Sequence, residues 1–134
     1  MSGPVRTLAV LALALLLAAL LLGVLAGIAF VLPEAPPWMN FTRLRPLHTT
    51  TALFWILTGA VAVMLVSRTD VVGVEPHRRL LHGFLFLWAG SLAIALVSYL
   101  VGRFGGREYW EFPPWLALPI GLAWVLLLID HARA

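Results

Sequence analysis

Four long apolar runs constrain what this chain can fold into more than any other feature. They cover about residues 8–32, 47–66, 80–101 and 115–129. A helix needs roughly 20 apolar residues to cross the hydrocarbon core of a membrane, and the first three runs reach that length. The fourth is shorter and contains Pro119, but tilting or a thinner bilayer accommodates a short span. We therefore predict an all-α integral membrane domain of four transmembrane helices, as part of a larger helical bundle.

The composition excludes several other classes of protein. Of the 134 residues, 62% are hydrophobic and only 11% are charged, whereas soluble domains carry roughly 25% charged residues. The arginines are scattered through the loops, so we expect no binding of nucleic acid. With no cysteine, the chain has no disulfide, thiolate metal site or covalently attached haem. The first run is longer than the apolar region of a signal peptide, which favours a retained membrane anchor.

The orientation in the membrane follows from the aromatic residues. The arginines divide five to four between the two sides, which is too even for the positive-inside rule to decide. Aromatic side chains gather at membrane interfaces, and here they gather with three glutamates on the side of the first and third loops. We place that side outside and both termini in the cytoplasm. The aromatic residues are Trp38, Phe41, Phe104, Tyr109, Trp110, Phe112 and Trp115.

One histidine at the head of the second run is a candidate metal or haem ligand. We predict that Pro46 is the first residue of that helix, because proline is tolerated in the first turn of a helix. His48 would then lie in the first turn. Ionisable side chains inside a membrane are costly and mark functional sites. Small residues along the same helix face, such as Ala52 and Gly59, would let a flat macrocycle lie against the helix. The alternative is a hydrogen-bonded histidine near the interface. Arg43 and Arg45 favour the first interpretation, because arginine pairs well with carboxylates.

The other histidines are weaker candidates. His77 and His131 lie in a loop and at the chain end, where a solvated role is expected. His82 lies near the start of the third run, on the side opposite His48. Because the second and third helices are antiparallel, we expect the two histidines to differ in depth by about 25 Å at 1.5 Å per residue. They cannot bind opposite faces of one haem, so a second axial ligand must come from another chain or a second copy.

Two glutamates in the third loop form a second candidate site. Glu108 and Glu111 are three residues apart, and on one helical turn they would share a face, on the same membrane side as His48. Such a pair could bind a hard cation through oxygens or relay protons. The alternative is a solvated pair neutralised by Arg103 and Arg107.

These two stretches together resemble a known family. Arg-Leu-Arg-Pro-Leu-His-Thr at residues 43–49, then Gly-Arg-Glu-Tyr-Trp-Glu at residues 106–111 and a further apolar span, are similar to the catalytic subunit of the haem-copper oxidase superfamily. The closest branches are the cbb-type cytochrome oxidases and the nitric-oxide reductases. The first motif resembles the oxidases more and the second the reductases. The order and spacing match the family's first four helices, which covers most of this chain.

The resemblance implies a role for each candidate residue. His48 would be an axial ligand of a low-spin haem b, and Arg45 and Arg43 would meet the haem propionates. Glu108 would hold a structural calcium ion near them, and Glu111 would take part in proton or water movement. His77 and His82 match no residue of the family's motifs.

The departure from the family is also informative. The remaining ligands of the family's haems and metal lie in later helices, and none of those residues is here. We expect a split or truncated N-terminal part of the catalytic core of a respiratory terminal oxidase or nitric-oxide reductase, inactive alone, in a bacterial cytoplasmic membrane. A second membrane chain would carry the remaining helices, and a cytochrome c-type protein would donate electrons. The alternatives are a homodimeric b-type cytochrome and a non-catalytic anchor or assembly subunit.

Overall fold

The computed structural model describes residues 3–32, 34, 36, 39–105, 107 and 111–133. It contains four long helices, each long and apolar enough to cross a membrane, which confirms the predicted all-α membrane fold. A π-helical turn η1 continues the second helix, and a 3-10 turn η2 precedes the fourth. The elements are α1 (Gly3–Val31), α2 (Phe41–Ser67), η1 (Arg68–Val72), α3 (Arg78–Leu100), η2 (Pro114–Leu116) and α4 (Ala117–Ala132).

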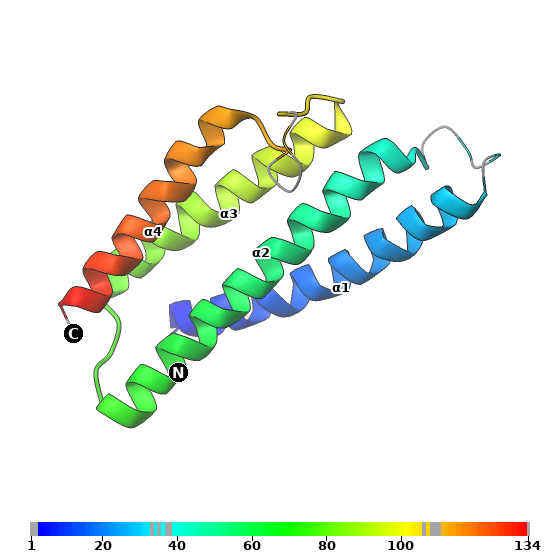
Figure 1. Ribbon diagram of the computed structural model, residues 1–134. Helices are drawn as coiled ribbons and strands as arrows, with labels where there is room; N and C mark the ends of the chain where they lie inside the picture. The colour runs from blue at the N-terminus through cyan, green and yellow to red at the C-terminus, as the bar shows by residue number, and fades with distance from the viewer. Residues whose placement is uncertain are drawn as a thin grey trace.

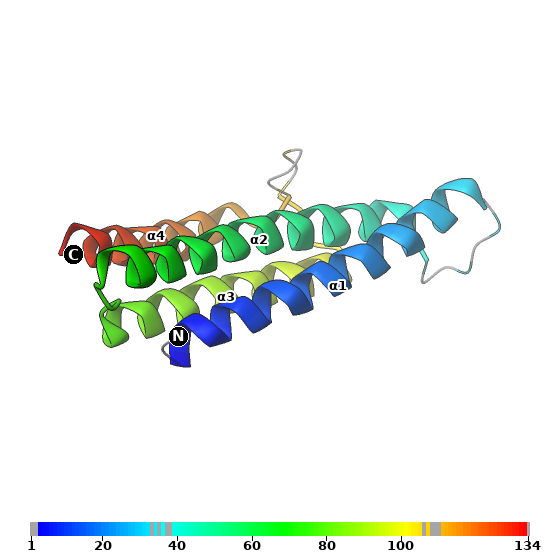
Figure 2. The same cartoon turned by 90° about the horizontal axis from the view of Figure 1, so that it is seen from below.

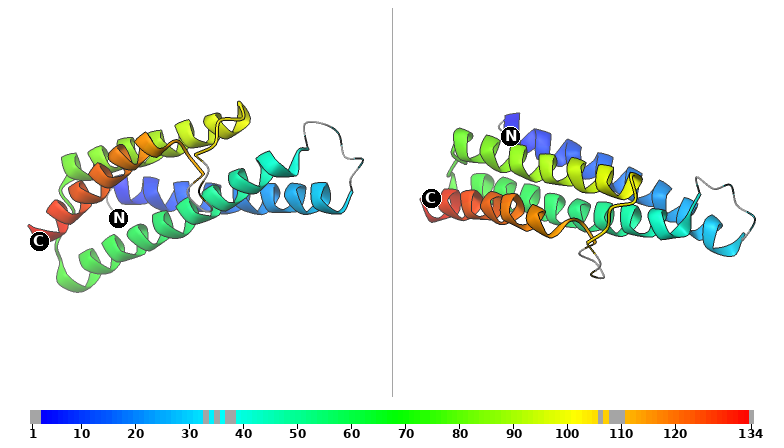
Figure 3. Two further views of the ribbon diagram at one scale, coloured as in Figure 1. Left: turned by 45° about the horizontal axis from the view of Figure 1, so that its top comes forward. Right: turned by 90° about the horizontal axis from the view of Figure 1, so that it is seen from above.

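The helices form two hairpins that lie side by side. In Figure 1, α1 runs along α2, and α3 runs along α4. Seen from below in Figure 2, the two hairpins overlap, with the helix axes roughly aligned. Figure 3 shows that both termini lie at the end where α2 connects to α3, and the other two connections lie at the opposite end. We call these the terminal end and the loop end.

The helix α2 begins earlier than the sequence predicts. Asn40 precedes its first residue, and the Asn40 side chain accepts a hydrogen bond from the Thr42 backbone N–H at 2.9 Å. This contact satisfies one of the free N–H groups at the helix start, so the helix starts upstream of Pro46. The prediction that Pro46 begins the helix is therefore wrong, since it lies inside α2. His48 lies about two turns into the helix rather than in its first turn.

A glycine ends α3 and directs the chain into the loop that follows. Gly102 has a φ of 76°, which residues with a Cβ rarely adopt. Its N–H donates to the Tyr99 carbonyl, and the Arg103 N–H donates to the Ser98 carbonyl. This is the paired hydrogen-bonding pattern of a Schellman motif. It satisfies two of the last carbonyls of α3 and lets the connector turn back over the loop end.

An aromatic cluster joins three of the helices at the centre of the bundle. Trp88 of α3 is buried, and its ring centroid lies 4.3 Å from that of Phe54 on α2 and 5.6 Å from that of Trp124 on α4. The indole N–H donates to the Thr58 hydroxyl at 2.8 Å. Buried indoles usually find such a partner. The cluster therefore packs α2 against the α3–α4 hairpin, and the buried Trp88 indole N–H is paired.

A buried ion pair joins the two hairpins at the terminal end. Arg68 Nη2 lies 2.8 Å from Asp130 Oδ2, and both side chains are almost fully buried. The other Asp130 oxygen accepts the His77 backbone N–H at 2.6 Å. The predicted spans end at residues 66 and 129, so the sequence places Arg68 and Asp130 outside the helices. Both expectations are wrong, because Arg68 continues α2 as η1 and Asp130 belongs to the last turn of α4.

We predict that Asp130→Asn lowers the free energy of unfolding by about 3–5 kcal/mol, because it leaves the Arg68 charge buried without a counter-ion. Thermal or denaturant unfolding in detergent measures the change. Asp70→Asn is the matched control, since Asp70 is an exposed aspartate in η1. Replacing both partners, as Arg68→Met with Asp130→Leu, should recover much of the loss. Equal stability of Asp130→Asn and Asp70→Asn would contradict this account.

Candidate functional site

His48 lies between α2 and α1, near the loop end. Its ring is half-buried, and Nδ1 lies 2.8 Å from the backbone carbonyl oxygen of Ala19 on α1. A carbonyl oxygen only accepts hydrogen bonds, so Nδ1 carries the hydrogen. In the neutral imidazole, Nε2 then keeps its lone pair, and no described residue forms a hydrogen bond with it. A lone pair on an oriented imidazole is what a metal ion or haem iron binds.

A glycine on α1 makes room for the histidine ring. A Cβ atom built at Gly23 would lie 2.8 Å from Cε1 and 3.0 Å from Nδ1 of His48. Gly27, one turn further along α1, has nothing within 4 Å of such an atom. Both glycines lie in the first predicted span, four residues apart. Of the two, Gly23 is therefore the one that provides close packing to α2.

The helix α1 packs against part of the α2 face expected to carry a flat macrocycle. A Cβ at Gly59 would lie 3.9 Å from the Cβ of Ala12, and Trp55 packs against the core that α1 shares. Gly59 of the predicted small-residue face therefore packs against α1. The reason is the close packing of α1 along α2, which small side chains on both helices permit.

The structure brings two of the predicted site residues together. Arg45 Nη2 lies 2.5 Å from Glu111 Oε1, and Glu111 is largely buried whereas half of the Arg45 side chain is exposed. The alternative that Arg103 and Arg107 neutralise Glu111 is therefore not what the structure has. Nor does Glu111 lie on a helical turn, because it is outside every helix and its backbone carbonyl accepts the Gly105 N–H.

Arg43 also contacts the α3–α4 hairpin. Its Nη1 donates to the Leu100 carbonyl oxygen at 3.3 Å, at the C-terminal end of α3. Cations are favoured at that end of a helix, where the last carbonyls carry a partial negative charge. Both arginines therefore tie the start of α2 to the other hairpin.

A buried hydroxyl pair was missed by sequence reasoning. Thr50 and Tyr99 are both buried, and their side-chain oxygens lie 3.0 Å apart between α2 and α3. The residues are far apart in the sequence, and nothing in their local patterns marks them as partners. The pair adds a third polar contact between the hairpins near the loop end.

The remaining candidates do not join His48. Glu108, predicted to bind calcium, lies outside the described residues. Within the part of the chain that the structure describes, no three metal-binding side chains come together. His82 lies at the terminal end, and its Nδ1 donates to the Arg78 carbonyl oxygen at 2.6 Å. It is exposed and distant from His48 along the helix axes, as the sequence predicts.

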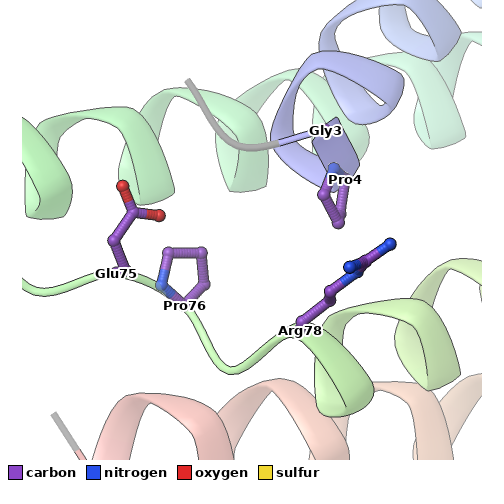
Figure 4. A pocket seen from close by; sticks show the side chains of 5 residues that line it. All are labelled: Gly3, Pro4, Glu75, Pro76 and Arg78. Atoms are coloured by element: carbon purple, nitrogen blue, oxygen red, sulfur yellow. The ribbon is translucent and has the colours of Figure 1, made fainter.

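A hollow of about 400 Å³ lies at the terminal end, far from His48. Figure 4 shows its lining at the start of α1 and just before α3, with the Arg78 side chain reaching toward Pro4 and the Glu75 carboxylate apart from it. The opposite charges of its two ionised side chains give it no net preference for an anion or a cation. The lining residues are Gly3, Pro4, Glu75, Pro76 and Arg78.

The sequence is similar to bacterial cytochrome c oxidase subunit 1. It is 35% identical over 96 residues to that protein from Rhodobacter capsulatus, which covers 68% of this chain and 18% of the relative. It is 34% identical over 119 residues to a cytochrome c oxidase subunit 1 homolog from Azorhizobium caulinodans, covering 81% of this chain and 21% of the relative. The chain thus spans about a fifth of the length of these relatives. No family model and no solved structure matches it.

We predict that the neutral His48 ring carries its hydrogen on Nδ1, because the Ala19 carbonyl holds it there. Nitrogen-15 NMR of the chain with labelled histidine, at alkaline pH in detergent, distinguishes the two tautomers. His48→Ala identifies the resonances. A ring protonated on Nε2 instead would contradict the geometry described above.

Proposed function

We propose, from the premise that this chain belongs to the haem-copper oxidase superfamily, that His48 is one axial ligand of a low-spin haem b. The chain would then form the N-terminal part of the catalytic core of a respiratory terminal oxidase. Its relatives named cytochrome c oxidase subunit 1 support oxygen rather than nitric oxide as the substrate. A haem held by two imidazoles has no open coordination position, so it serves to pass electrons.

The hydrogen bond between His48 and Ala19 is the observation that carries this proposal. Histidines that bind metals almost always donate their other ring N–H to a carbonyl, a carboxylate or water. His48 has this arrangement, with Nδ1 on the Ala19 carbonyl oxygen at 2.8 Å. The contact fixes the tautomer, limits rotation of the ring and leaves Nε2 as the coordinating atom. The donor chemistry therefore fits a haem iron.

The two arginines would serve the haem carboxylates. Arg45 now pairs with Glu111, and its half-exposed guanidinium can exchange that partner for a propionate. Arg43 would have to leave the Leu100 carbonyl to do the same. Once Arg45 moves, the Glu111 carboxylate is free to accept or pass protons, which is the role the family resemblance implies. The calcium ion at Glu108 rests on that resemblance alone.

A second polypeptide completes the proposed site. His82 is at the other end of the bundle, so this chain offers a single imidazole at the depth of His48. We propose that a membrane chain with the remaining helices supplies the second axial ligand and the oxygen-reducing site, and that a cytochrome c-type protein delivers electrons. The assembly would lie in a bacterial cytoplasmic membrane, with the loop end outside.

The experiment is to purify the chain in mild detergent with whatever co-isolates, and to record reduced-minus-oxidised spectra. We expect a low-spin b-type band in the wild type that His48→Ala removes. His82→Ala is the matched control, because His82 makes the same kind of Nδ1 bond to a helix carbonyl at the opposite end. The band should survive in that variant.

Other outcomes would favour the alternatives. A band that persists in His48→Ala, with a partner present, would overturn haem ligation and indicate an anchor or assembly subunit. If the wild-type chain isolated without any partner shows the band, and His48→Ala removes it, the result would indicate a homodimeric cytochrome with two copies of His48.

We also predict that Arg45→Gln lowers the midpoint potential of this haem. Loss of a nearby positive charge disfavours the reduced form, which carries one more negative charge. Redox titration of the purified complex measures the shift. Arg6→Gln, at the terminal end, should leave the potential unchanged; an unchanged potential in Arg45→Gln would remove Arg45 from the site.

A further inference from the structure

We infer that Gly23 is a positioning residue for His48: its missing side chain uncovers the Ala19 carbonyl that orients the histidine ring. This inference rests on the proposed haem ligation for its functional meaning. The contact itself is a property of the two helices. The inference gives α1, a strongly apolar helix, a role in the site: it orients the His48 ring.

The geometry of an α-helix explains why a glycine is needed at this position. The carbonyl of residue 19 accepts the backbone N–H of residue 23, one turn further on. A Cβ in a helix points back toward the N-terminus, over the preceding turn. A side chain at position 23 therefore covers the side of the Ala19 carbonyl that a neighbouring helix can reach. Without one, a second donor can approach that oxygen from α2.

The distances show that the space is filled by the histidine ring. A Cβ at Gly23 would lie 2.8 Å from Cε1, 3.0 Å from Nδ1 and 3.5 Å from Nε2 of His48. Cε1 and Nδ1 of the ring thus lie closest to the glycine, and Nε2 lies further from it. A Cβ contact of 2.8 Å forces one of the two groups to move. The ring is the end of a side chain with two rotatable bonds, so it would move before the helices do.

The expected consequence is a change at the ligand and not in the fold. Gly23→Ala would push the ring from the Ala19 carbonyl, so Nδ1 would lose its acceptor and the tautomer would no longer be fixed. For a bound haem, the loss of this hydrogen bond makes the imidazole a weaker donor. A weaker donor stabilises oxidised iron less, so the midpoint potential rises. Alanine is a better helix former than glycine, which favours α1 itself.

The chain provides its own matched control. Gly27 lies one turn from Gly23 on the same helix, and a Cβ there would have nothing within 4 Å. Gly27→Ala makes the same chemical change in α1 without touching His48. Any effect of Gly23→Ala that exceeds that of Gly27→Ala therefore arises from the ring.

The test uses the purified chain with its co-isolating partner. Electron paramagnetic resonance of the oxidised low-spin haem and redox titration are recorded for wild type, Gly23→Ala and Gly27→Ala. We expect shifted g values and a raised midpoint potential only in Gly23→Ala. Unchanged g values and potential in that variant would overturn the inference. If Gly23→Ala does not assemble with its partner, nitrogen-15 NMR of the chain alone decides. A His48 ring that keeps its hydrogen on Nδ1 in Gly23→Ala would likewise overturn the inference.

Failure of the inference and failure of the proposed function are distinguishable. If His48→Ala removes the haem band and Gly23→Ala changes nothing, only the inference is wrong. If His48→Ala leaves the band intact, the proposed ligation is wrong. In that case nitrogen-15 NMR of His48 in the chain still decides the inference, because Gly23→Ala, unlike Gly27→Ala, must disturb the Nδ1-protonated tautomer.

Discussion

A membrane interior offers no water to a polar group, so a polar side chain inside this bundle is stabilised by a protein partner. The structure supplies such partners at three levels along its length, although Thr51 Oγ1, Arg68 Nε and Ser91 Oγ are buried without one. Asp130 holds Arg68 and a backbone N–H at the terminal end. Trp88 donates to a hydroxyl at the centre. His48 donates to a backbone carbonyl near the loop end, and this contact leaves Nε2 of its ring without a hydrogen-bond partner among the described residues.

The packing within the α1–α2 hairpin differs in kind from the contacts between the two hairpins. Within the α1–α2 hairpin, small residues such as Gly23 and Gly59 allow close packing. Between the hairpins, polar contacts lie at both ends. The buried pair at the terminal end is fixed, since separating it exposes a charge to lipid. The Arg45–Glu111 pair at the loop end is partly exposed, so it is the weaker tie and the one that a carboxylate-bearing ligand could replace.

The four membrane-spanning helices could be predicted from the sequence, because the length of each apolar run can be measured without knowing how the helices pack. The sequence singled out His48 but not the contact of His48 with Gly23, which depends on how α1 and α2 pack. The start of α2 was misplaced because Pro46 is a strong local signal, and the Asn40 cap upstream outweighs it. Arg68 and Asp130 fall outside the predicted spans, because the apolar runs end at residues 66 and 129. Their pairing is what allows both to be buried, and no local pattern records it.

The central claim is that α1 orients His48 through one backbone carbonyl so that its other nitrogen binds haem iron. The most direct test is an experimental structure of this chain in its purified respiratory complex. The account predicts His48 Nε2 bonded to a haem iron, with Nδ1 still on the Ala19 carbonyl above Gly23. A haem held by other ligands, with His48 unbonded between α1 and α2, would contradict it.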